Sequence, residues 1–165
     1  MMLRFIFAFL LFIPFSYAQR GYPKPTKTNN LLFYVQHSDN KNTFVYEINP
    51  SNTSDPIDVF RINYEDKAQK EAITPIQRKF AYGVNYANAS KSQFSLAATR
   101  KNTFDLKSAN GKYWVELKVG NQIIKVDNVF ISLDPKSSGM NMKADYILIY
   151  GKNKQNKSVV EKIKP

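Results

Sequence analysis

The sequence predicts a mainly β fold: an antiparallel, strongly curled sheet or barrel of about 10 strands, with a two-sheet β-sandwich as the alternative. Short segments in which apolar and polar residues alternate recur about every ten residues, and turn residues separate them. One stretch near residues 66–80 lacks this alternation and shows helical spacing instead. We favour the curled sheet because closure or curling leaves few free strand edges.

The chain begins with the features of an export signal. Arg4 supplies a positive charge, an apolar run follows over residues 5–15, and small residues at positions 16 and 18 indicate cleavage after Ala18. The run is too short for a membrane anchor, which needs about 20 apolar residues. We therefore expect residues 1–18 to be a signal peptide, with no membrane span left after its removal.

The remaining chain divides into a leader and one domain. Residues 19–30 contain two prolines and few apolar side chains, so we expect a flexible leader. Residues 31–165 are long enough for a single β-rich domain with its own core. The absence of cysteine favours a bacterial periplasm or outer surface as the location, because exported eukaryotic domains are often held by disulfides.

The alternating segments predict ten or eleven strands, joined in several places by short polar turns. The stretch "SDNKN" is typical of a hairpin loop between the first two strands, and "ANGK" and "VGNQ" are typical of hairpin turns farther along. The predicted strands cover residues 31–37, 43–49, 57–64, 84–88, 92–98, 103–107, 112–119, 122–126, 128–133, 144–150 and 158–163.

The stretch from residue 65 to residue 80 predicts helical turns. Apolar residues such as Ile76 and Phe80 fall at helical spacing. Pro75 interrupts the pattern, so we expect two short turns instead of one helix. Gly83 follows the second turn, where a left-handed conformation or a close backbone approach requires a residue without a side chain.

Several classes of chemistry are missing from the sequence. The absence of cysteine excludes thiolate nucleophiles and thiolate metal sites, and the single histidine, His37, excludes metal sites that need several imidazoles. His37 is a poor partner for Ser38, because neighbouring residues of a strand point to opposite faces. With only six glycines, the chain carries no P-loop, no dinucleotide motif and no G-x-S-x-G elbow. We expect no cofactor, no metal and no catalytic residues.

The formal net charge is +11, and the charge is unevenly distributed. Residues 31–66 hold six acids against Lys41 and Arg61, whereas residues 67–118 hold ten basic residues against three acids. This balance indicates either solvated strand faces or an anionic partner. Because we expect export, nucleic acid is not an expected partner.

The first function that the sequence supports is noncatalytic binding in the bacterial envelope. The ligand would be an anionic or amphipathic small molecule or another envelope component, held in the mouth or interior of the curled sheet. The candidate contact residues combine cations with aromatic or imidazole rings: His37, Arg61, Arg78, Lys79 and Tyr82.

Two alternatives remain open. A hydrolase acting on envelope polysaccharide would need two carboxylates facing each other across a cleft, and Asp55, Asp58, Glu65 and Asp66 are the available cluster. A structural or interaction subunit would expose an apolar patch or an open edge strand.

Four runs of the sequence resemble the family of domain of unknown function 4833, over most of the chain from Leu31 to Pro165. The runs are "LFYVQHSDNKNTFVYEIN", "DPIDVFRINY", "ITPIQRKFAYGVNY" and "VVEKIKP". The resemblance implies one compact domain, exported in many bacterial members, and it implies no activity. In the family pattern an arginine is common at the position of His37 and a tryptophan at that of Arg61. The resemblance therefore speaks further against a catalytic His37.

Overall fold

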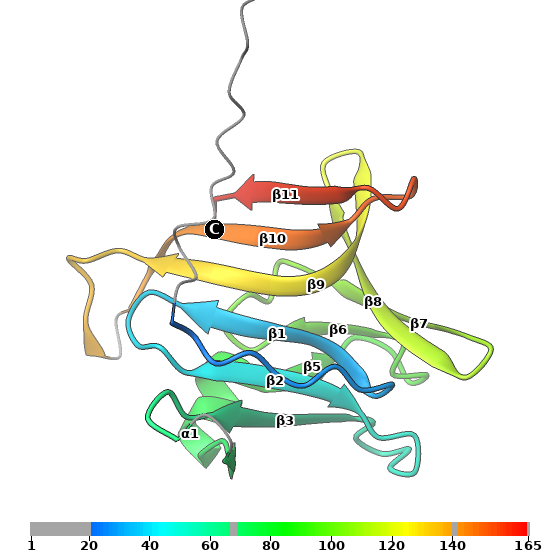
Figure 1. The fold of residues 1–165 in the computed structure, drawn as a ribbon, viewed down its shortest axis with the longest axis horizontal. Helices are drawn as coiled ribbons and strands as arrows, with labels where there is room; N and C mark the ends of the chain where they lie inside the picture. Colours follow the sequence, from blue (N-terminus) through cyan, green and yellow to red (C-terminus); the bar gives the residue numbers. More distant parts are fainter. Residues whose placement is uncertain (1–20, 67–68, 140–141, 165) are drawn as a thin grey trace, which may run out of the picture.

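The computed structural model describes residues 21–66, 69–139 and 142–164, so the expected signal peptide and its cleavage site lie outside the described residues. The described chain forms eleven strands and one short helical segment (Figure 1). The strands are β1 (Leu31–His37), β2 (Thr43–Ile48), β3 (Ile57–Ile62), β4 (Lys70–Ala72), β5 (Val84–Tyr86), β6 (Gln93–Leu96), β7 (Phe104–Ala109), β8 (Lys112–Val119), β9 (Gln122–Leu133), β10 (Ala144–Lys152) and β11 (Ser158–Ile163).

All eleven strands belong to one curled sheet, as predicted. Its order is β4-β3-β2-β1-β9-β8-β7-β6-β5, with β10 pairing to β9 and β11 to β10. The sheet divides at β9, because residues 122–125 pair with β8 while residues 128–131 pair with β1. Every pairing is antiparallel except that of β1 with β9, which is parallel. In the described part of the chain the path stays open between β4 and β5, so the fold is a half-barrel.

The two halves of the sheet share one aromatic core. The ring of Phe33 on β1 stacks on Tyr46 of β2 at a centroid distance of 4.4 Å and on Phe104 of β7 at 5.5 Å. Phe94 of β6 adds a further stacked ring, 5.4 Å from Phe104. These four side chains are at most 2% exposed, so the halves face each other across a dry interior. In Figure 1, β5 and β6 accordingly lie behind β1–β3.

The two strands predicted at residues 122–126 and 128–133 are one continuous strand, β9. The prediction left Asp127 out of both strands, but the sheet accommodates this residue in an irregularity of register, where Asn128 pairs with Tyr150 and Val126 with Gly151. Gly151 of β10 lies at this irregularity, where the carbonyl oxygen of Lys125 leaves no room for a Cβ atom.

The predicted helical stretch is partly strand. Lys70–Ala72 forms β4, which pairs with the edge of β3. The helical residues are α1 (Pro75–Gln77) and a π-helical turn, η2 (Arg78–Tyr82). Pro75 starts the helix after Thr74, whose hydroxyl accepts a hydrogen bond from the Gln77 N–H while the Gln77 side chain accepts one from the Thr74 N–H. Because the segment joins β4 to β5, it connects the two ends of the sheet path.

Residues 21–30, the described part of the expected leader, lie along the outer face of the sheet in front of β1 and β2 (Figure 1). The carbonyl oxygen of Pro23 accepts hydrogen bonds from Thr43 Oγ1 at 2.6 Å and Gln36 Nε2 at 3.3 Å, and Tyr22 Oη donates to the His37 carbonyl at 2.9 Å. The prolines favour this extended path. We call residues 21–30 the strap.

Candidate functional site

Three of the five candidate residues meet on the inner face of the sheet, around Phe44 of β2. The ring of Tyr82, the last residue of η2, stacks on Phe44 at a centroid distance of 3.4 Å. The imidazole of His37 at the end of β1 lies 5.9 Å from Phe44 and 6.0 Å from Tyr82. Arg61 of β3 is the cross-strand partner of Phe44. The sheet pairing and the helical segment thus bring together side chains that are far apart in sequence.

His37 is a buried, neutral member of this aromatic cluster. Its side chain is 4% exposed, and neither ring nitrogen has a hydrogen-bond partner among the described residues. Burial lowers the pKa of His37, and the carboxylate of Asp39 opposes this only in part. Burial also raises the pKa of Tyr82. Among the described residues, therefore, no side chain orients the His37 ring through a hydrogen bond.

Arg61 is occupied by an ion pair. Its guanidinium contacts the Glu71 carboxylate on β4, with 2.6 Å between Nε and Oε2, and Asn63 donates a further hydrogen bond to the same carboxylate. These hydrogen bonds lower the pKa of Glu71. Arg61 therefore holds the short strand β4 against β3.

Arg78 and Lys79 lie outside the cluster. Both side chains are exposed on η2, and the Lys79 amino group lies 5.2 Å from the ring centroid of Phe80, which is itself exposed. The structure therefore separates these two candidate residues from His37, Arg61 and Tyr82.

A hollow of about 380 Å³ lies between the loop of residues 97–102 and the strand β10. Its lining residues are Ala97, Ala98, Thr99, Arg100, Lys101, Asn102, Ile147 and Lys164. Its apolar lining consists of the two alanines and Ile147, a core residue that is 1% exposed; we call these three residues the floor. Three cationic side chains stand around this floor, and no acidic residue lines it.

The hollow lies at the same end of the half-barrel as the aromatic cluster. Ile147 pairs across β9 with Ile131, and Ile131 pairs with His37, so the floor lies two strands, or about 10 Å, from His37. The N–H of Ala98 also donates to the carbonyl of Ala81 at 3.1 Å, which ties the loop to η2 beside Tyr82.

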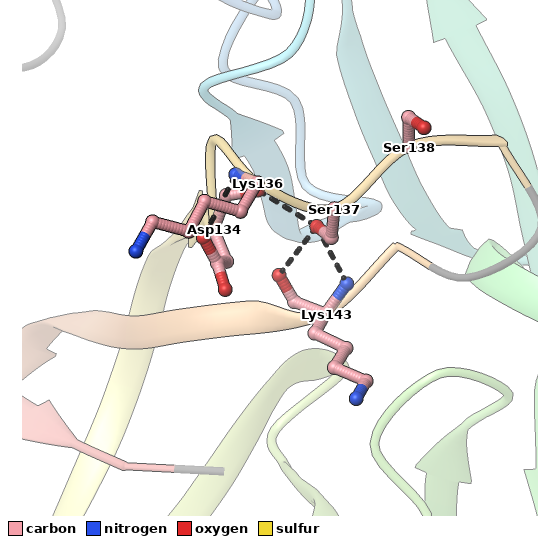
Figure 2. A pocket seen from close by; sticks show the side chains of 5 residues that line it. All are labelled: Asp134, Lys136, Ser137, Ser138 and Lys143. Carbon is pink, nitrogen blue, oxygen red and sulfur yellow. Dashed lines mark hydrogen bonds between the residues drawn. The ribbon is translucent and has the colours of Figure 1, made fainter.

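A second hollow, of about 400 Å³, lies within the loop that follows β9. Its residues are Asp134, Lys136, Ser137, Ser138 and Lys143. Ser137 Oγ donates to the Asp134 carbonyl at 2.7 Å and accepts from the Lys143 N–H at 3.0 Å, so its hydroxyl holds the loop together. Figure 2 shows that the amino groups of Lys136 and Lys143 point in different directions. These side chains do not converge on a ligand position.

Sequence reasoning missed Ile147, Arg100, Lys101 and Lys164. The one available signal was the excess of basic residues in the second half of the chain. Nothing in the sequence indicates that a loop after β6, the middle of β10 and the residue after β11 meet.

The four acids considered for a hydrolase do not form a facing pair. All four are exposed. Asp55 and Asp58 lie at the start of β3, where they accept hydrogen bonds from Tyr86 and Asn49, whereas Glu65 and Asp66 follow the other end of that strand. The described residues also contain no group of three or more His, Cys, Asp or Glu side chains that could hold a metal ion. None of the described helices is long and apolar enough to cross a membrane.

The sequence model of the family described as "Domain of unknown function (DUF4833)" matches residues 33–162. The chain belongs to this family. The matched residues run from β1 into β11, so the DUF4833 domain corresponds to the whole curled sheet, and the strap precedes it. No curated protein and no solved structure matches the chain.

Proposed function

We propose that this DUF4833 domain is an exported, noncatalytic protein of the bacterial envelope that binds an anionic amphipathic small ligand. The observation that carries the proposal is the hollow beside β10, which combines an apolar floor with three cationic side chains. An amphipathic anion satisfies both parts, because its chain contacts Ile147 and the alanines while its head group lies among the cations.

The electrostatics of the hollow support an anionic head group. In the described part of the chain, no ion pair engages Arg100, Lys101 or Lys164. The N–H groups of Ala97 and Ala98 anchor the start of the loop of residues 97–102, because they donate to the carbonyls of Gly83 and Ala81. Cations without ion-pair partners attract anions, and because the loop backbone is already anchored, binding costs little free energy for ordering it. At about 380 Å³, the hollow lies at the small end of the roughly 300–1,000 Å³ typical of ligand sites, which suits a short-chain ligand.

Export and the lack of catalysis have separate support. The features of residues 1–18 are those of a cleaved signal peptide. The dispersed carboxylates and the buried, unpartnered His37 offer no pair of groups that could act together on a substrate. A binding role needs no such pair of catalytic groups.

The proposal is tested by calorimetric titration of the chain from Gln19 onward with octyl phosphate below its micelle concentration. We expect saturable binding to octyl phosphate and at least tenfold weaker binding to octanol and to inorganic phosphate. Replacing Arg100, Lys101 and Lys164 together by Gln should weaken octyl phosphate binding by about tenfold or more, since charged hydrogen bonds contribute about 1.5–3 kcal/mol each.

The matched control is the exposed pair Lys154→Gln with Lys157→Gln, which lowers the net charge at a site away from the hollow. The control should bind octyl phosphate like the parent chain. Equal binding of octanol and octyl phosphate, or full binding by the triple variant, would contradict the proposal.

A further inference from the structure

The helical segment of residues 75–82 displays two large apolar side chains to solvent. Ile76 is 71% exposed and Phe80 is 56% exposed, which makes them two of the four large hydrophobic side chains exposed among the described residues. They are four residues apart on successive helical turns, so they lie on neighbouring parts of one face. A pair of this kind marks a contact surface more often than an isolated exposed residue does.

Basic side chains accompany this pair. Arg78 and Lys79 are exposed between Ile76 and Phe80, and neither forms an ion pair within the described chain. The Lys79 amino group lies 5.2 Å from the Phe80 ring centroid, so the positive charge stands at the edge of the apolar surface. The sequence contains no acidic residue between Glu71 and Asp105. The local charge therefore favours a negatively charged partner.

The segment is fixed to the fold, so its outward side chains are a stable feature of the surface. Thr74 and Gln77 form reciprocal hydrogen bonds at its start. At its end, the Tyr82 ring stacks on Phe44, and Tyr46 Oη donates a hydrogen bond of 2.8 Å to the Tyr82 carbonyl. Anchoring at both ends lowers the ordering cost of any contact made by Ile76 and Phe80.

We propose that this segment docks the domain on an anionic phospholipid surface. Ile76 and Phe80 insert at the level of the lipid head groups, where aromatic side chains are favoured. Lys79 contacts the lipid phosphates, and Arg78, which is two residues from both Ile76 and Phe80 and so lies on another side of the turn, adds positive charge near the bilayer. A bilayer fits better than a protein groove, because the apolar side chains are few and the Lys79 amino group lies beside Phe80. We call Ile76, Lys79 and Phe80 the docking face.

The test is co-sedimentation of the chain from Gln19 onward, which contains every described residue, with vesicles of two compositions. We expect binding to vesicles containing phosphatidylglycerol and little binding to pure phosphatidylcholine. Raising the salt concentration should weaken binding, because the Debye length falls to about 3 Å at 1 M salt. The double variant Ile76→Ser with Phe80→Ser, and separately Arg78→Gln with Lys79→Gln, should each lower the affinity about tenfold or more.

Two matched controls assign the effect to this face. Val160→Ser removes another exposed apolar side chain, at 55% exposure, and Lys154→Gln with Lys157→Gln removes two exposed charges elsewhere. Both controls should bind vesicles like the parent chain. If the control pair weakens binding as much as the docking-face variants, net charge alone explains binding and the proposal is overturned.

Two further outcomes would also overturn it. One is the absence of co-sedimentation with phosphatidylglycerol vesicles at low salt. The other is self-association in sedimentation velocity that the Ile76→Ser with Phe80→Ser variant abolishes while vesicle binding stays unchanged, which would assign the face to a second copy of the chain. Melting temperatures of all variants show whether each one is folded, and the serine pair should melt within a few degrees of the parent because both side chains are exposed.

Discussion

Gly83 is the residue at which the helical segment turns into β5, and it has no room for a side chain. Its backbone is extended, with φ −65° and ψ 158°, so the expected left-handed conformation is not the reason for glycine here. The reason is the close approach of the Arg78 backbone, whose carbonyl oxygen occupies the position of a Cβ atom. The alternative we considered from the sequence, a close backbone approach, is correct.

Gly83→Ala should lower the free energy of unfolding by about 1–3 kcal/mol, because an added methyl group must displace backbone in a packed site. Urea denaturation measures this loss. The control is Gly111→Ala, whose Cβ meets open space and whose φ of 73° imposes strain of only about 1 kcal/mol. An equal loss in the two variants would show that the close approach has no energetic consequence.

His37 makes the stability of the fold depend on pH. Its pKa is lowered by burial, so below about pH 6.5 the unfolded chain binds a proton that the folded chain resists. The free energy of unfolding should therefore fall as the pH drops below about 6.5, by up to about 1.4 kcal/mol per pH unit, until the folded-state pKa is reached. Glu71, whose pKa is lowered from 4.5, loses its contribution only at a lower pH.

Urea denaturation between pH 5 and pH 7.5 checks this dependence, and His37→Phe is the matched variant. Phenylalanine keeps an aromatic ring beside the stacked rings of Phe44 and Tyr82 and cannot take up a proton. Its stability should be nearly flat over this range. A slope equal to that of the parent chain would assign the pH dependence to other groups.

At the scale of the elements, the strap stabilises the sheet from outside, although it is not one of its strands. It covers Gln36 and Thr43, which face outward and are nevertheless at most 1% exposed. Its Pro23 carbonyl accepts hydrogen bonds from both side chains. Tyr22 contributes an edge-to-face contact with Phe130 of β9 at 6.1 Å. The strap therefore joins three neighbouring strands, β2, β1 and β9, from outside.

A chain beginning at Asn29 should lose about 2–4 kcal/mol of the free energy of unfolding, since an aromatic contact, three side-chain hydrogen bonds of about 1 kcal/mol each and the hydrogen bonding of the Leu31 N–H to Thr28 disappear. Urea denaturation measures the loss. Tyr22→Phe keeps the ring contact and removes one hydrogen bond, so it should lose about 1 kcal/mol. If the shortened chain is as stable as the longer one, the strap is a passive surface segment.

The elements that the sequence predicts well are those with clear alternation. The strands β1, β8 and β11 begin and end where the apolar pattern does. The strand β4 was missed, because its three residues are too few to show a period and owe their pairing to Arg61 and Glu71. The break predicted at residue 127 inside β9 was wrong, because the irregularity of register beside Gly151 accommodates Asp127 without ending the strand.

At the scale of the whole molecule, the fold class was predictable and the site was not. Ten or eleven short alternating segments indicate a mainly β fold, and the curled sheet was favoured over a sandwich because curling leaves few free edges. Along one edge, β9 pairs first with β8 and then with β1, and this arrangement opens the sheet into two facing halves. The sequence contains no sign of this arrangement. This division brings the loop of residues 97–102 toward β10, and it creates the hollow.

The residues of the candidate site were also only partly predictable from the sequence. His37, Arg61 and Tyr82 were chosen for their chemistry, and the fold does gather them around Phe44, but there they pack with one another or form an ion pair. Arg100, Lys101 and Lys164 were part of the charge excess and had no local pattern. The sequence does not show which cations lack an ion-pair partner, because that depends on the side chains that the fold places around them.

The most direct test of this account is methyl NMR of the chain from Gln19 onward during titration with octyl phosphate. We predict saturable shift changes at the Ile147 methyl groups and at Ala97 and Ala98, weaker changes with octanol, and loss of these changes when Arg100, Lys101 and Lys164 are replaced by Gln. Shift changes confined to the loop of residues 134–143, or no changes at all, would contradict the assignment of the hollow beside β10 as the ligand site.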